Sequence, residues 1–127
     1  MRKLYASGEE YLKWILKVQK KIGAVRSIDL AEYMGFSRPS ISIAVKKLED
    51  GEFLTKDANG YLHLTERGRI IAENIYERHE FFTELLSSIG VEHSVAEEDA
   101  CRIEHVISEE TFQKIKENFK AHPIECI

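Results

Sequence analysis

The sequence predicts a mainly α-helical protein in two parts: three helices and a hairpin, followed by a region made only of helices. Apolar residues recur at helical spacing through most of the 127 residues, and the clearest hairpin signal lies near the middle of the chain. Charge divides in the same way. Residues 1–70 carry 13 Lys/Arg and 9 Asp/Glu, whereas residues 71–127 carry 5 and 13. We therefore expect two domains, 1–70 and 71–127, with different roles.

The first two predicted helices are separated by glycine. Ser7 can cap the first helix, which should end near Gly23. A short second helix covers residues 28–34 and stops at Gly35. The apolar stripe of the first helix consists of Tyr11, Ile15, Val18 and Ile22.

A third helix and a hairpin complete the first part. Ser37 is the expected cap of this helix, and Pro39 lies in its first turn, where a missing N–H costs nothing. Strands are expected at 53–56 and 61–64, around the turn Asp57-Ala58-Asn59-Gly60. This order of elements is typical of a winged helix-turn-helix. The buried face of the third helix should hold Ile41, Val45 and Leu48.

The opposite face of the third helix has the chemistry of a DNA-reading surface. Arg38 can form paired hydrogen bonds to guanine, and Ile43 can contact a thymine methyl group. Serines at the helix start let the backbone approach phosphates. The alternative is an ordinary solvated face on a small helical core, but an exposed Ile43 favours DNA binding. The candidate DNA-binding residues are Ser37, Arg38, Pro39, Ser40, Ser42, Ile43 and Lys46.

The second part begins with a long helix predicted from Thr65 to about Ser88. His79 lies within its apolar stripe, and such a histidine is more often a hydrogen-bonded core residue than a ligand. The sequence Ser94-Val95-Ala96-Glu97 is a capping box that should open a further helix. A last helix should begin at residues 108–111. The apolar residues of the long and last helices are Ile71, Ile75, Phe82, Leu86, Phe112, Ile115 and Phe119.

A candidate metal site lies in the helix predicted after Ser94. Cys101, Glu104 and His105 stand at positions i, i+3 and i+4, so that they share one helical face, with Glu97 one turn earlier. Sulfur, oxygen and nitrogen donors together suit Fe(II), Mn(II), Co(II) or Zn(II) better than Mg or Ca. The alternative is a charged surface cluster beside a half-buried cysteine.

Taken together, these residues resemble the diphtheria-toxin-repressor and manganese-transport-regulator family of metal-dependent transcriptional repressors. That resemblance implies a helical metal-binding and dimerisation domain after the winged helix. It also implies a homodimer that binds a palindromic operator in double-stranded DNA when Fe(II) or Mn(II) is bound, with Co(II), Ni(II) or Zn(II) possible in vitro. The matching segments are 9–12, 37–42, 64–68, 78–79 and above all 99–108.

Carried over by motif, the resemblance implies a primary metal site of Glu10, Cys101, Glu104 and His105. Glu10 replaces a methionine of iron-type members and an aspartate of manganese-type members, whereas Cys101 follows the iron-type pattern. His79 matches a ligand of a neighbouring second site, where Glu97 replaces a histidine. The implied site is therefore a hybrid of the two branches.

The resemblance also has departures. Thr83 stands where a second-site glutamate is expected, and Lys13 replaces a first-helix carboxylate of manganese-type members. The chain resembles the short, two-domain members, which lack an SH3-like domain. The dimer surface is expected on the later helices, with Phe81, Phe82 or Ile89 as anchors.

Other classes fit less well. No apolar run approaches the ~18 residues of a membrane span, and the N-terminus has no signal-peptide core, so we expect a cytoplasmic protein with reduced thiols. A redox regulator that pairs Cys101 with Cys126 shares the DNA-binding half and remains an alternative. A small metalloenzyme is less favoured, because the chain has no Ser/His/Asp set, HExxH motif or glycine-rich phosphate loop, and we expect no small organic substrate.

Overall fold

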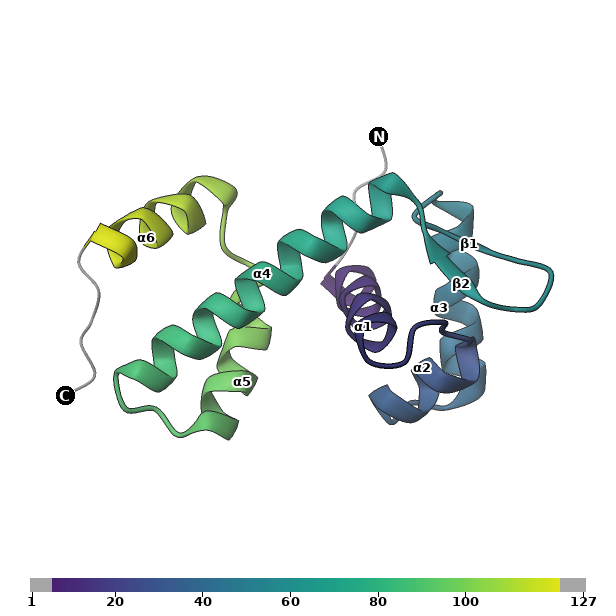
Figure 1. The fold of residues 1–127 in the computed structure, drawn as a ribbon, viewed down its shortest axis with the longest axis horizontal. Coiled ribbons are helices and arrows are strands. Elements are labelled where there is room, and N and C mark those ends of the chain that lie inside the picture. Colours follow the sequence, from purple (N-terminus) through teal and green to yellow (C-terminus); the bar gives the residue numbers. More distant parts are fainter. Residues whose placement is uncertain (1–5, 122–127) are drawn as a thin grey trace. The chain divides into compact units, whose positions relative to one another are not determined.

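The structure is a computed structural model that describes residues 6–121. Its elements follow one another as in Figure 1, and they divide into two compact units between Asn74 and Ile75. No helix of the described range is long and apolar enough to cross a membrane. The elements are α1 (Ala6–Ile22), α2 (Ser27–Met34), α3 (Arg38–Asp50), β1 (Leu54–Lys56), β2 (Leu62–Leu64), α4 (Glu66–Ser88), α5 (His93–Ile103) and α6 (Glu109–Ala121).

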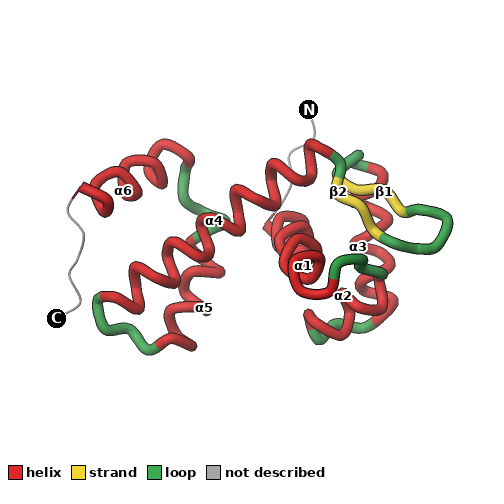
Figure 2. Tube along the Cα trace, in the orientation of Figure 1, coloured by secondary structure: helices red, strands yellow, loops and turns green. Residues whose placement is uncertain are grey.

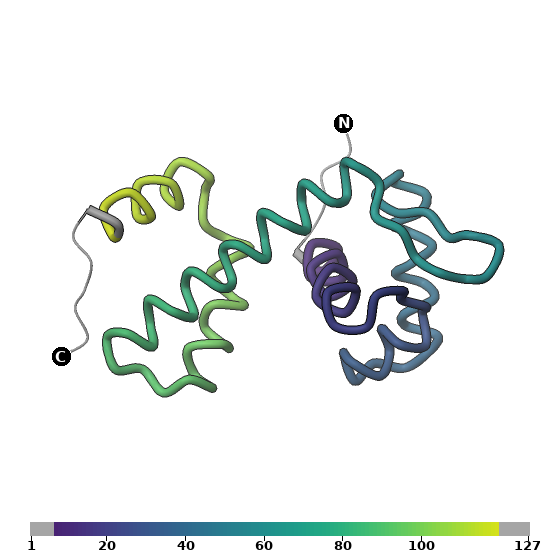
Figure 3. Tube along the Cα trace, viewed as in Figure 1, coloured from purple at the N-terminus to yellow at the C-terminus, as the bar shows by residue number. Residues whose placement is uncertain are grey.

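The first unit is a winged helix-turn-helix. Helices α1, α2 and α3 pack against one another, and β1 and β2 form an antiparallel pair in which Leu54 faces Leu64 (Figure 2). A further bridge joins Arg26 to Tyr61, so the segment before α2 adds to the hairpin. The hairpin follows α3 directly, as the colour sequence of Figure 3 shows. This arrangement leaves one face of α3 free of the unit's core.

The apolar stripes predicted for the first unit form its core. Ile41, Val45 and Leu48 are at most 3% exposed, and Ser37 caps α3 by accepting a hydrogen bond from the Ser40 amide at 3.3 Å. Burial of such side chains contributes roughly 1.5–3 kcal/mol each. The other buried apolar residues here include Leu12, Ile15, Val18, Val25, Leu30, Phe53, Leu54 and Leu62.

The second unit contains the C-terminal part of α4 with α5 and α6. Phe82 of α4, Ala100 of α5 and Phe112 of α6 form its buried core. Edge-to-face aromatic contacts surround them, since the Phe81 ring lies 5.2 Å from Phe82 and 5.6 Å from Phe112. Phe82, one of the three candidate dimer anchors, is only 4% exposed and belongs to this core, whereas Ile89 is 57% exposed.

Several predicted boundaries were also wrong. Ser7 lies inside α1 instead of capping it. The capping box at Ser94 does not form: Glu92 is the N-cap residue of α5, and the Ser94 hydroxyl donates to the Glu92 carboxylate at 2.9 Å. His93 is therefore the first residue of α5. The strands are also one residue shorter at their starts than predicted.

Candidate metal centre and DNA-binding surface

The end of α5 places three of the predicted metal ligands together. The helix ends at Ile103, so Cys101 lies in its last turn, whereas Glu104 and His105 follow it. Glu104 nevertheless keeps helical dihedral angles, and its amide donates to the Ala100 carbonyl at 2.9 Å. The predicted i and i+3 relation of Cys101 and Glu104 is therefore kept, although the helix ends earlier than predicted. One ligand atom from each of the three side chains lies within 4.8 Å of the others.

Glu104 is the central residue of this cluster. It is fully buried, and its Oε2 lies 2.8 Å from Nδ1 of His79 on α4. Its Oε1 lies 3.2 Å from Nε2 of His105. A buried carboxylate is costly unless it is paired, and two imidazoles supply that pairing here. His79 therefore belongs to the same cluster as the three ligands from the end of α5.

The donor set fits a transition metal. A thiol, a carboxylate and an imidazole are ligands of Zn(II) and Fe(II), and bond lengths of about 2.0–2.3 Å place neighbouring donors roughly 3–4 Å apart. The three donors lie within 4.8 Å of one another, and the Glu104–His105 pair is already 3.2 Å apart. Cys101, Glu104 and His105 thus offer donor atoms of the kind that could hold such an ion.

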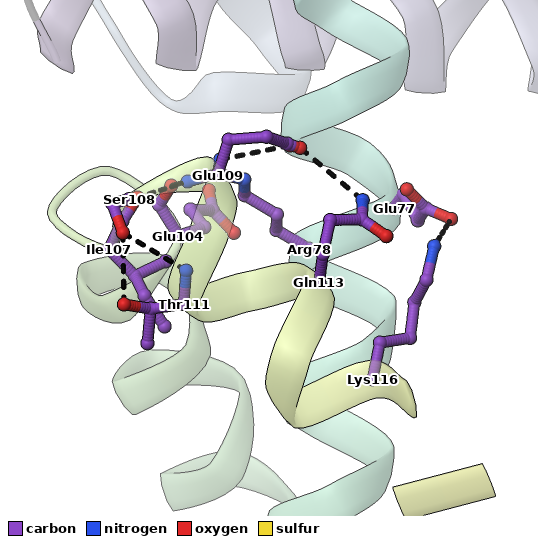
Figure 4. Close-up of polar contacts among 9 residues, drawn as sticks. All are labelled: Glu77, Arg78, Glu104, Ile107, Ser108, Glu109, Thr111, Gln113 and Lys116. Carbon is purple, nitrogen blue, oxygen red and sulfur yellow. Dashed lines mark hydrogen bonds and ion pairs between the residues drawn. The ribbon is translucent and has the colours of Figure 1, made fainter. Parts of the chain in front are cut away.

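Arg78 of α4 holds the backbone that carries these ligands (Figure 4). It is 8% exposed, and its Nη1 donates to the Glu104 carbonyl at 3.3 Å and to the Ile107 carbonyl. Its Nη2 pairs with Glu109 at 3.4 Å. Below this group, the Ser108 hydroxyl accepts from the Thr111 amide and starts α6. Arg78 thus fixes the turn between α5 and α6 at the ligand positions.

Glu97 and Thr83 are the other residues considered for a second metal site, and their surroundings differ from those of the Glu104 cluster. Glu97 is exposed and its Oε1 lies 2.6 Å from His93 Nε2, one turn earlier on α5. The Thr83 hydroxyl is buried and has no hydrogen-bond partner among the described residues. Cys126, the partner suggested for Cys101 in the redox alternative, lies outside the described residues.

Glu10 lies on α1 of the first unit, where two donors hold its carboxylate. Lys13 Nζ lies 2.9 Å from Oε1, and Trp14 Nε1 donates to Oε2 at 3.1 Å. These donors stand three and four residues later, which is the spacing that brings helical side chains together. The Lys13 side chain is only 2% exposed, whereas that of Glu10 is 24% exposed.

The candidate DNA-binding residues lie on one exposed surface at the start and along the outer face of α3. Arg38 and Pro39 occupy its first turn, and Ile43 is 59% exposed. Lys46 is held loosely, 3.9 Å from Asp50. An apolar side chain left this exposed beside basic and hydroxyl groups suits a surface that meets base edges and phosphates. All seven predicted residues are exposed: Ser37, Arg38, Pro39, Ser40, Ser42, Ile43 and Lys46.

The hairpin beside α3 is closed by Asp57. Its Oδ1 accepts from the amides of Asn59 and Tyr61, and its Oδ2 lies 2.8 Å from His63 Nε2. The hydrogen bond from His63 and then the one from the Tyr61 amide lower the pKa of the Asp57 carboxyl below its ordinary value. The turn signal in the sequence pointed to this hairpin, but not to His63 as a partner of its first residue.

Sequence reasoning missed the supporting residues of both units. Arg78 enters the sequence analysis only as part of a matching motif. The available signal was its position three residues after Ile75 and four before Phe82, on the buried face of α4. Trp14 was not considered, although its spacing of four from Glu10 is visible in the sequence. Lys13 was noted only as a departure, and its burial was not foreseen.

Known proteins were compared with this chain in sequence and in fold. Residues 3–66 match the family described as iron dependent repressor, N-terminal DNA binding domain. Residues 65–126 match the family described as iron dependent repressor, metal binding and dimerisation domain. The transcriptional regulator MntR of Escherichia coli O157:H7 is 28% identical over 108 residues, which cover 85% of this chain and 70% of that protein.

Solved structures show the same architecture. The manganese regulator SloR superimposes with a TM-score of 0.76 at 28% identity, over 94% of this chain and 55% of that one. The IdeR protein of T. acidophilum gives 0.76 at 27% identity, over 94% and 56%. This chain thus spans about half the length of these structures. With both of its units matched, the chain belongs to the iron-dependent repressor family, whose members are transcriptional regulators and not enzymes.

Proposed function

We propose that this protein represses transcription in response to a divalent transition metal, as a cytoplasmic homodimer on a palindromic operator. The observation that carries the proposal is the cluster of Cys101, Glu104 and His105, whose donor atoms converge within 4.8 Å. The exposed face of α3 supplies the second requirement, a surface with basic, hydroxyl and apolar groups. Two-fold symmetry of a dimer requires related half-sites in the DNA.

We infer that Glu10 completes the primary site. Glu10 belongs to the first unit and the other three ligands to the second, so one ion bound by all four would link the DNA-binding unit to the metal-binding unit. When bound, the metal supplies a positive charge that these four donors share. A ligand favours one conformation of a protein only by binding that conformation more tightly than the others. An ion held by all four residues would bind most tightly to the conformation in which Glu10 can reach it, and would therefore favour that conformation.

Residues of the second unit prepare the site. His79 and His105 hold the two oxygens of Glu104, and Arg78 holds the backbone on either side of His105. Groups that orient metal ligands in this way typically change affinity by about 10–100-fold when they are removed. His79 can act either as this orienting group or as a ligand of a second ion, together with Glu97.

The metal is proposed to be Fe(II) or Mn(II). SloR is described as a manganese regulator, and a manganese-dependent transcriptional repressor solved in complex with manganese is 25% identical to this chain, with a TM-score of 0.77. A site that contains the Cys101 thiolate favours softer ions than a site made only of oxygen and nitrogen ligands does. Co(II), Ni(II) and Zn(II) are therefore expected to bind in vitro.

The experiment is a DNA-binding titration. Protein stripped with a chelator is mixed with a fluorescent duplex from the promoter beside its own gene, and anisotropy is followed with Mn(II), anaerobic Fe(II) or Zn(II). We expect binding only with metal, and loss of the metal response in Glu10→Ala and in Glu104→Gln. Glu98→Gln, which removes an exposed carboxylate from α5, should behave as wild type.

Two outcomes would contradict the proposal. Equal DNA binding with and without metal would remove the metal as the signal. Metal-independent DNA binding that disappears on thiol oxidation in wild type, but survives the same oxidation in Cys126→Ser, would instead favour the redox alternative in which Cys101 pairs with Cys126. Circular dichroism of each variant checks that the fold is intact.

A further inference from the structure

The carboxylate of Glu10 is held from both sides by its own helix. Lys13 Nζ lies 2.9 Å from Oε1, and Trp14 Nε1 donates to Oε2 at 3.1 Å. Lys17 Nζ lies 4.3 Å from the centroid of the same indole ring. The two oxygens that a metal would use therefore already face hydrogen-bond donors on α1.

Lys13 is unusual for a lysine because it is 1% exposed. A lysine almost never becomes fully buried without a partner for its ammonium group, since removing that group from water is costly. Its buried position keeps the ammonium beside Glu10, because swinging out to solvent would require repacking of the surrounding side chains. The ammonium thus occupies a position next to Oε1 that a second cation would otherwise take.

A metal and this ammonium have opposing requirements. Each attracts the Glu10 carboxylate, but the two cations repel each other, and this repulsion is strong at short distance when water is excluded. A metal that binds Oε1 must either displace Lys13 Nζ or share the oxygen with it. Trp14 differs, because its neutral N–H can stay on Oε2 while the carboxylate binds a metal.

We propose that Lys13 is a resident cation that competes with the metal for Glu10 and so raises the metal concentration at which the protein responds. Trp14 is a positioning residue that keeps the carboxylate aligned on α1. This inference rests on the proposed function, since it takes Glu10 to be a metal ligand. It concerns a buried lysine one helical turn from the carboxylate.

Calorimetric titration with Mn(II) and Zn(II) tests the competition. Lys13→Met keeps the volume and removes the charge, and it should bind metal about tenfold more tightly or better, because the repulsion is gone. Lys13→Arg keeps a cation and should retain an affinity near that of wild type. Lys21→Gln is the matched control, because it removes one exposed charge from the same helix.

The single tryptophan of the chain provides a second measurement. Because Trp14 touches Glu10, Zn(II) should shift its emission in wild type and in Lys13→Met, at about tenfold lower Zn(II) in the variant. Glu10→Ala should abolish the shift. Zn(II) is chosen because its filled d shell gives no redox chemistry that could quench the indole.

The outcomes separate the two proposals. Metal binding by wild type with equal or weaker binding by Lys13→Met overturns the competition and leaves the proposed function standing. No metal binding by either protein overturns both. Metal binding by Lys13→Met with no binding by wild type supports the inference, because the Lys13 ammonium then excludes the metal from Glu10. Thermal unfolding of each variant confirms that the comparison is between folded proteins.

Discussion

Replacing Arg78 by methionine should loosen the turn that carries the proposed metal ligands. The guanidinium donates to the carbonyls of Glu104 and Ile107 and pairs with Glu109, and methionine keeps the apolar part of the side chain while removing every donor. Since Arg78 is 8% exposed, solvent cannot readily replace these hydrogen bonds. The perturbation therefore acts on backbone positions and leaves the ligand side chains themselves unchanged.

The expected magnitude follows from these contacts. A hydrogen bond from a charged donor contributes roughly 1.5–3 kcal/mol, and two carbonyls lose such a donor. The ion pair with Glu109 adds little, because the Glu109 side chain is 52% exposed. Removing a buried charge returns some desolvation energy, so we expect a net loss of about 3 kcal/mol in the free energy of unfolding. Metal affinity should fall about 10–100-fold.

Urea unfolding of the metal-free protein measures the free energy of unfolding, and calorimetric titration with Mn(II) measures the metal affinity. Arg69→Met is the matched control on the same helix, because Arg69 is 52% exposed and its pair with Glu73 spans 3.8 Å. This control should lose no more than about 0.5 kcal/mol and keep its metal affinity. A loss below that value in Arg78→Met, with unchanged metal affinity, would refute the role assigned to this residue.

Three further changes have defined outcomes. Gly68→Ala should destabilise the first unit by about 1–3 kcal/mol or more in urea unfolding, because the added Cβ would lie 1.9 Å from the Phe53 carbonyl oxygen; unchanged stability would contradict this. The lowered pKa of Asp57 stabilises the fold above the ordinary carboxyl range, and this contribution is lost as pH falls through the folded-state pKa. Asp57→Asn should therefore weaken the acid dependence of unfolding, and an identical pH profile would count against the pairing with His63. Cys101→Ala should lose more affinity for Fe(II), Co(II) and Zn(II) than for Mn(II) in calorimetry, whereas equal losses would argue against thiolate ligation.

The first unit was largely predictable because its signals are local. Ser37 caps α3 through contacts within one turn, and the burial of Ile41, Val45 and Leu48 follows from helical periodicity. The turn at Asp57 likewise carries its own hydrogen-bond acceptor. In such segments, the residues that determine the structure are neighbours in the sequence.

The end of α5 was not predictable in the same way. Its helical pattern continues through Glu104 and His105, yet the helix stops at Ile103, and the Glu104 carbonyl accepts from Arg78, 26 residues earlier. Propensity cannot anticipate such a partner. The pairing of His79 with Glu104 has the same origin, since two helices bring these residues together. Spacing could single out the three candidate ligands near the end of α5, but not the side chains that hold them.

The exposed Ile43 has a thermodynamic consequence under the proposed function. In the protein without DNA, Ile43 is 59% exposed, so its apolar hydration contributes to the heat capacity. Removal of that hydration by a thymine methyl group would make the heat capacity of association more negative. Operators that differ only in thymine content opposite Ile43 should then differ in how their affinity changes with temperature.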